Sequence, residues 1–115
     1  MRDWARNLYD ETARMLEVNG KGPADCRWVG SVDGSMAISW AAFEVIAKRT
    51  NYDAGFGGQV ISPRLVVVGD DWWMERHEYD GSEWWEFKTL PVRAADARPF
   101  DSVAIDDNYN DPLDG

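Results

Sequence analysis

The sequence predicts an α+β domain in which two helices cover one face of a mainly antiparallel sheet of about five short strands. Apolar residues recur at helical spacing in two segments, residues 4–16 and 40–49. Two Asp-Gly pairs are flanked by short strand-like runs, and residues 65–68 are continuously apolar. The expected order is therefore α-β-β-α-β-β-β within a single domain of residues 1–100, followed by an acidic, partly disordered tail over residues 101–115.

Both helices have a candidate residue for the N-terminal cap. Asp3 can cap the first helix and Asn19-Gly20 ends it. Its apolar stripe consists of Trp4, Leu8, Thr12, Met15 and Leu16. Ser39 can cap the second helix, Trp40–Arg49, on which one face carries Phe43, Ile46 and Ala47.

The strands are predicted from turn residues and apolar runs. Asp33-Gly34 tolerates the positive φ of a two-residue turn, which favours a hairpin of Arg27–Val32 with Ser35–Ile38. Leu65–Val68 is typical of a central strand. Asp80-Gly81 predicts a second hairpin, made of Trp72–Tyr79 and Glu83–Leu90.

Residues 50–63 are predicted to form a loop with a role of its own. They contain Gly55, Gly57, Gly58 and Pro63, which break any regular pattern. The Gly-rich part lacks the Lys and Ser or Thr of a phosphate-binding loop and does not lead into a helix. A tight or flexible turn is the simpler interpretation.

Alternation along the last hairpin divides its side chains into two sets. One set suits the core, packed against Phe43, Ile46 and Leu16, and comprises Trp72, Met74, Arg76, Trp85 and Phe87. The other set is half charged and comprises Trp73, Glu75, His77, Trp84, Glu86 and Lys88. This second face is either a contact surface for a partner or a sheet face covered by the loop or the tail.

The charge distribution excludes some classes of partner. The chain has 21 acidic and 12 basic residues, a net charge of -9 and a pI near 4.4. Nucleic acid and anionic membranes bind clustered cations, so neither is an expected direct partner. The acids gather in the tail, which carries -5, and in residues 70–86, where seven acids accompany one Arg. Such clusters serve either solubility or recognition of a basic surface.

The lack of certain segments and of further cysteines indicates the expected location and excludes disulfide bonds within the chain. No apolar run has the length of a membrane span, and residues 1–4 lack the apolar block of a signal peptide, so we expect a soluble cytoplasmic protein. Cys26 is the single cysteine, which excludes a disulfide framework or a cysteine zinc cluster within the chain. We expect Cys26 to be a small buried apolar residue.

No arrangement of residues specifies a reaction, and we expect no catalytic residues, no metal site and no cofactor. His77 is the single histidine, and no Ser or Cys is spaced to form a nucleophile with it. Glu75 and Glu86 face each other across the hairpin, but a neighbouring cation explains them more simply than acid-base chemistry. The acidic stretch from Asp106 begins like a calcium loop, yet Asp111 occupies the position that requires Gly.

Four sequence features together resemble small acidic proteins encoded by bacterial phages and prophages. The likeness covers about residues 36–91 and rests on Ser39-Trp40 with Phe43, on Tyr52–Gly58, on Leu65–Gly69 and on Glu78–Trp85. It implies a shared small fold and no functional residues. Because proteins of such elements often act on host immunity, the resemblance also implies the anti-CRISPR class as one expectation, with the host cytoplasm as location.

Two hypotheses of function follow, and neither is an enzyme. In the first, the protein is an inhibitor that binds a basic, nucleic-acid-binding surface of a host protein, such as a CRISPR effector. The partner-binding residues would be Asp70, Asp71, Trp73, Glu75, His77, Trp84 and Glu86. In the alternative, the 52–58 loop and the aromatic hairpin form a pocket for a small ligand or peptide, with Tyr52, Asp53 and Phe56 as binding residues.

Overall fold

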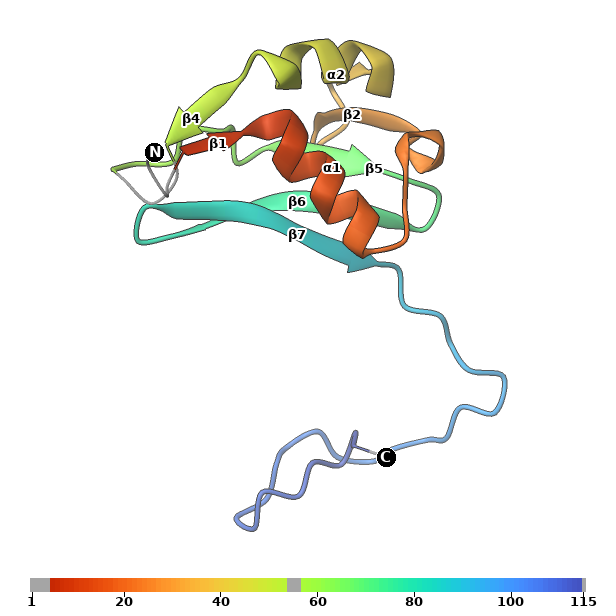
Figure 1. Ribbon diagram of the computed structural model, residues 1–115. Coiled ribbons are helices and arrows are strands. Elements are labelled where there is room, and N and C mark those ends of the chain that lie inside the picture. The colour runs from red at the N-terminus through yellow and green to blue at the C-terminus, as the bar shows by residue number, and fades with distance from the viewer. Residues whose placement is uncertain (1–4, 54–56, 115) are drawn as a thin grey trace.

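The computed structural model describes residues 5–53 and 57–114 and has the predicted α+β architecture. Two helices lie on one face of a five-stranded antiparallel sheet, and a two-stranded pair lies beside them (Figure 1). The helices are α1 (Leu8–Val18) and α2 (Trp40–Lys48), with a short 3-10 turn at Pro23–Asp25. The strands are β1 (Ala5–Asn7), β2 (Trp28–Ser31), β3 (Ala37–Ile38), β4 (Asn51–Asp53), β5 (Leu65–Val68), β6 (Trp72–Tyr79) and β7 (Ser82–Thr89).

The main sheet has the strand order β3-β2-β5-β6-β7. β5 is the central strand, as its apolar run predicts, and both Val66 and Val67 are buried. β6 and β7 pair in the predicted register about Asp80 and Gly81, whose φ values of 51° and 86° give a two-residue turn. The Asp-Gly pair and the alternation of apolar and polar residues therefore predicted the turn and the register of the last hairpin correctly.

The first helix begins later than the sequence predicts. Asn7, not Asp3, caps α1 by accepting a hydrogen bond at 3.1 Å from the backbone N–H of Asp10. The residues before it form β1, which pairs with β4 inside the predicted loop. This pairing joins segments more than forty residues apart and has no local signal. Asp3 and Trp4, like Gly55 and Phe56, lie outside the described residues.

The second helix matches its prediction except at its end and on one face. Ser39 caps α2 by accepting from the N–H of Ala42 at 3.1 Å, and Arg49 is the residue after the helix. Phe43 and Ala47 are buried as expected. Ile46 was expected in the core but is 41% exposed, because α2 turns its Trp40, Phe43 and Ala47 face toward the sheet.

The first hairpin is shorter than predicted. The pairs Val29↔Ile38 and Gly30↔Ala37 close a longer loop in place of the two-residue turn at Asp33-Gly34. Asp33 Oδ1 accepts hydrogen bonds from the Ser31 and Ser35 hydroxyls and from the Ser35 N–H. This side-chain network stabilises a broader turn, which the dipeptide alone does not reveal.

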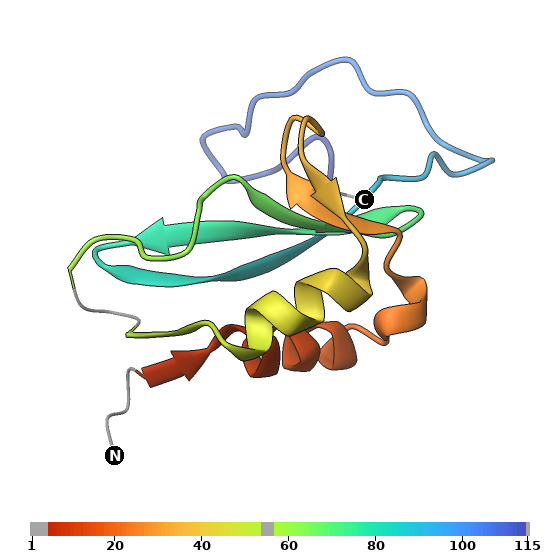
Figure 2. The ribbon, with the colours of Figure 1, turned by 90° about the horizontal axis from the view of Figure 1, so that it is seen from above.

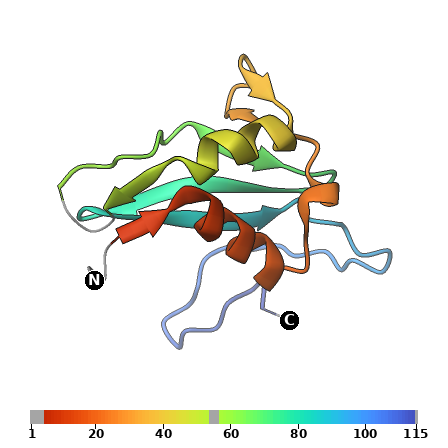
Figure 3. The same ribbon diagram turned by 45° about the horizontal axis from the view of Figure 1, so that its top comes forward.

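The core lies between the two helices and the inner face of β6 and β7 (Figure 3). Trp72, Met74 and Trp85 are each no more than 3% exposed, as predicted for the inner set. Phe87 of the same set is only partly buried and stacks on Trp72. The Trp85 indole N–H donates to the Thr12 hydroxyl of α1 at 2.9 Å. The Thr12 hydroxyl in turn donates a hydrogen bond to the Leu8 carbonyl at 2.6 Å, so the Trp85 indole is connected to the backbone of α1.

The chain after β7 is exposed and contains no helix or strand over residues 90–114. The apolar side chains of Phe100, Val103 and Ile105 are between 59% and 72% exposed, so they do not pack on the domain. The tail leaves the end of β7 and runs on the side of the sheet opposite the helices (Figure 1). Its acids and prolines interrupt the apolar residues too often to build a covered face.

Removing residues 106–115 is expected to leave the domain folded. Residues 106–114 are exposed apart from the partly buried Pro112, and the hydrogen bonds of Asp106 go to Asn108 and Asn110 within the tail. Thermal unfolding followed by circular dichroism should give the same melting temperature for the shortened and the full chain at low concentration. A substantially lower melting temperature would show that the tail packs as part of the core.

Candidate binding surface on the final hairpin

The outward face of the β6–β7 hairpin gathers two Trp, two Glu, one His and one Lys. We call this set the outer face; it consists of Trp73, Glu75 and His77 on β6 with Trp84, Glu86 and Lys88 on β7. The register places Trp73 opposite Lys88, Glu75 opposite Glu86 and His77 opposite Trp84, as the sequence predicts. The alternation of the two strands therefore brings six aromatic and ionisable side chains onto one surface.

Glu75 is fixed by two neighbours on its own strand. Its Oε1 accepts from the Trp73 indole N–H at 2.7 Å, and its Oε2 lies 2.7 Å from His77 Nε2. The Trp73 hydrogen bond, followed by that of His77, lowers the pKa of the Glu75 carboxyl group. The carboxylate is thus ionised and held in one orientation, with a third of the side chain exposed.

Glu86 is held in the same way on β7. Its Oε1 lies 3.2 Å from Lys88 Nζ, and its Oε2 accepts from the Trp84 indole N–H at 3.2 Å. The contacts with Lys88 and then Trp84 lower the pKa of the Glu86 carboxyl group. His77 Nδ1 lies 3.4 Å from Glu86 Oε2, so the imidazole stands between the two carboxylates.

This arrangement offsets the repulsion expected of two carboxylates placed directly opposite each other. His77 and Lys88 supply the compensating contacts, and the indole N–H groups of both Trp point to carboxylate oxygens. Trp84 is still 36% exposed, and Trp73 is partly buried. The outer face is a preorganised surface of aromatic rings and anions, which suits a cationic or guanidinium group.

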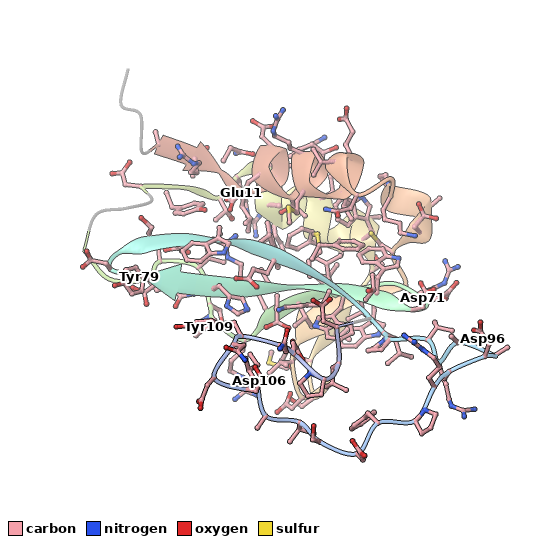
Figure 4. The ribbon with its side chains drawn as sticks, turned by 90° about the horizontal axis from the view of Figure 1, so that it is seen from below. Glu11, Asp71, Tyr79, Asp96, Asp106 and Tyr109 are labelled. Carbon is pink, nitrogen blue, oxygen red and sulfur yellow. The ribbon has the colours of Figure 1, made fainter. Side chains whose placement is uncertain are left out.

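Two of the predicted partner-binding residues lie at one end of this surface. Asp70 and Asp71 occupy the turn before β6, and Figure 4 shows Asp71 at the end of the hairpin opposite Tyr79. Arg27 donates to both Asp70 carboxylate oxygens, at 2.7 and 2.9 Å, which lowers the pKa of Asp70. Asp71 is exposed, and its carbonyl accepts from the Leu90 N–H at 2.9 Å.

The structure also contains a buried ionic cluster that sequence reasoning missed. Arg76 donates to Glu11 Oε1 at 2.8 Å, to Glu83 Oε1 at 3.0 Å and to the Tyr52 hydroxyl at 3.1 Å. The Arg76 and Glu83 side chains have no exposed surface. Glu83 also accepts from the N–H groups of Val60 and Ile61, at 2.6 and 3.0 Å. The cluster therefore ties α1, β4, the 57–61 segment and the hairpin together.

Glu83 corrects the sequence-based picture of a uniformly exposed acidic hairpin. Glu83 is one of the seven acids of residues 70–86, but it is 6% exposed and its charge is balanced in the core by Arg76. The register contained a signal for this, because Glu83 and Arg76 fall on the same inner face. An Arg on an apolar face requires a buried anion, and Glu83 is a near neighbour across the hairpin.

Of the alternative ligand-binding residues Tyr52, Asp53 and Phe56, the first two line one cavity. The Tyr52 ring is buried, and its hydroxyl donates to Glu11 and accepts from Arg76. Burial, followed by the hydrogen bond to Glu11, raises the pKa of Tyr52 to about 12. Tyr52 and Asp53 line a cavity of about 380 Å³ together with Asn51 and residues 5–7. Phe56 lies outside the described residues.

Cys26 is partly buried rather than fully enclosed, and burial raises the pKa of its thiol to about 11.

Within residues 5–53 and 57–114, no group of three or more His, Cys, Asp or Glu side chains is arranged to hold a metal ion. In the same residues, neither helix has the length and apolar character required to cross a bilayer.

Comparisons with known proteins found no match. No family model matches the chain, and no curated protein or solved structure is significantly similar to it. The outer face is therefore interpreted from its own residues and contacts.

Proposed function

We propose that this protein is a binding protein whose outer face docks on a basic surface of another protein. The observation that carries the proposal is the arrangement of Glu75 and Glu86, two ionised carboxylates held side by side between Trp73 and Trp84. Indole rings supply contact area at an interface centre, and fixed carboxylates select cationic groups. The net charge of -9 adds long-range attraction to a basic partner.

The internal contacts of the outer face favour an Arg or Lys from the partner. His77 and Lys88 already show that nitrogen donors fit beside both carboxylates, at distances between 2.7 and 3.4 Å. A guanidinium group arriving from a partner can donate hydrogen bonds to the same carboxylate oxygens and lie against an indole ring. Because the carboxylates are already oriented, binding orders few side chains and costs less conformational entropy.

The partner class that we propose is a host protein with a nucleic-acid-binding surface, including a CRISPR effector. Asp71, Glu75 and Glu86 present anions along the hairpin, with Glu75 and Glu86 directly opposite each other and Asp71 at one end. A nucleic-acid-binding surface carries cations that bind phosphates, and these cations can bind carboxylates instead. A counter-defence protein from a phage would block one such site locally, since a charge of -9 is modest for mimicry of a duplex.

Charge reversal on the outer face is expected to weaken partner binding. A partner captured from host lysate would be identified by mass spectrometry, purified and tested with the double variant Glu75→Lys, Glu86→Lys. Its association should be slower and less dependent on salt than that of the original protein, because electrostatic steering is lost. Trp73→Ala and Trp84→Ala should mainly hasten dissociation, by roughly 30-fold for a loss of about 2 kcal/mol.

A matched control separates the outer face from net charge. The double variant Asp96→Lys, Asp107→Lys changes the charge by the same amount at exposed positions after β7. It should alter the association rate far less than the outer-face reversal. Equal effects of the two double variants, or binding unaffected by either Trp change in folded proteins, would contradict the proposal.

The second candidate function is the binding of a small ligand, which the cavity beside Tyr52 and Asp53 supports. Asp53→Asn would then reduce binding of that ligand, whereas the outer-face variants would not. A screen of small molecules by thermal shift, comparing the original protein with Asp53→Asn, distinguishes this candidate from the first.

A further inference from the structure

Among the strands of residues 5–53 and 57–114, β7 is the last of the sheet and has one edge that pairs with no other strand. Tyr79 and Ser82 flank the two-residue turn, so the even-numbered residues of β7 hydrogen-bond to β6. The Leu90 N–H, which donates to Asp71, continues that series. The backbone N–H and C=O groups of the odd-numbered residues therefore point away from the sheet. These residues are Glu83, Trp85, Phe87 and Thr89.

A groove accompanies this edge on its helical side. Helix α1 lies along the β7 side of the sheet, as Figures 2 and 3 show from two directions. Between them is a cavity of about 480 Å³, lined on the α1 side by Glu11, Arg14, Met15 and Val18 and on the β7 side by Trp84 and Trp85. An open strand edge beside a helix can accept an extended segment, which pairs with the strand and places alternate side chains in the groove.

The tail contains a segment with the complementary properties. Residues 99–105 (Pro-Phe-Asp-Ser-Val-Ala-Ile) make no backbone-to-backbone hydrogen bond within the described chain. Val103 and Ile105 alternate with small residues, and both are more than half exposed. Phe100 is also exposed, at 60%. Such a segment has the β-branched residues of a strand but no strand to pair with.

We propose that residues 99–105 of a second copy of this chain add to β7 as a sixth strand of the sheet, and that two copies exchange their tails. The pairing satisfies the open backbone groups of β7 and of the tail together. Val103 and Ile105, or Phe100, then enter the groove beneath α1, where Met15 and Val18 provide apolar contact. The segment comes from another copy because each chain's own tail runs on the opposite side of the sheet from α1 (Figure 1).

The groove carries one cation that the segment can meet. Residues 99–105 contain one acid, Asp101, and no base, whereas the exposed Arg14 lines the groove. Asp10 and Glu11 lie there too, but the Glu11 carboxylate is already bound by Arg76 and Tyr52. Since each whole copy carries -9, added salt should strengthen the dimer, which is opposite to its expected effect on binding a basic partner.

The first test is the oligomeric state of the full chain, measured by sedimentation velocity over micromolar concentrations. We expect twice the monomer mass at the upper end. The variant Val103→Pro, Ala104→Pro should be monomeric, because successive N–H groups point to opposite sides of a strand and one of the two must face β7. The control Ala94→Pro, Ala95→Pro lies outside the segment and should still dimerise. A monomeric full chain, or a dimer that survives the 103–104 change, overturns the proposal.

The second test identifies the occupant. In a Cys26→Ser background, Val18→Cys combined with Ile105→Cys should form a disulfide between chains when differently tagged copies are mixed and oxidised. A disulfide within one chain would show that each tail binds its own β7, and it would overturn the exchange. Arg14→Glu and Val18→Asp should abolish the dimer while leaving the outer face able to bind a basic partner, so failure of this proposal is distinguishable from failure of the proposed function.

Discussion

Truncation of Trp85 to Ala is expected to destabilise the fold by about 3 to 5 kcal/mol. The side chain is 3% exposed, stacks over the Arg76 guanidinium at 4.9 Å and donates to the Thr12 hydroxyl. Its removal leaves a cavity between the hairpin and α1 and leaves the buried Thr12 oxygen with one hydrogen bond fewer. Urea unfolding followed by circular dichroism measures the loss directly.

The neighbouring residue provides the control for this prediction. Trp84 precedes Trp85 on β7 but belongs to the outer face and is 36% exposed. Trp84→Ala should therefore destabilise the protein far less than Trp85→Ala. Trp85→Phe should fall between them, since it keeps most of the ring packing and loses the indole donor. Equal destabilisation by the two Ala variants would mean that the two faces of the hairpin are not assigned correctly.

Neutralising Glu83 is expected to cost a similar amount, about 3 to 5 kcal/mol, because it leaves a buried cation without one of its anions. Glu83→Gln removes the negative charge from a side chain that binds Arg76 and two backbone N–H groups at residues 60 and 61. Glu11 still contacts Arg76, but it lies on a different element and is partly exposed. We therefore expect both a lower midpoint of urea unfolding and faster backbone hydrogen exchange at residues 60 and 61.

Glu86→Gln is the matched control for Glu83→Gln. Glu86 lies on the same strand, and the substitution removes the same charge, but its side chain is 35% exposed and its partners are at the surface. The control should lower the midpoint of urea unfolding far less than Glu83→Gln does, because exposed ion pairs contribute little to stability. If Glu83→Gln is as mild as Glu86→Gln, the buried cluster does not hold the 57–61 segment in place.

The last hairpin is the part of the fold that the sequence predicts in most detail. Asp80-Gly81 defines a two-residue turn, and strict alternation then assigns every side chain of β6 and β7 to a face. The same reasoning failed for β1 and β4, which are three residues each and have no pattern of their own. It also failed for the start of α1, because the choice between Asp3 and Asn7 as cap depends on where β1 ends.

Sequence patterns predicted the fold class, both helices, the central strand, and the register and two faces of the final hairpin, including the six residues of the outer face. These features depend on local periodicity and turn chemistry, which are properties of neighbouring residues. The three-dimensional structure was needed to show that Arg76 meets Glu11, Tyr52 and Glu83, and that the tail leaves the β7 edge open. Such contacts join residues distant in the chain, and a sequence pattern specifies the face on which a residue lies but not the partner that it meets there.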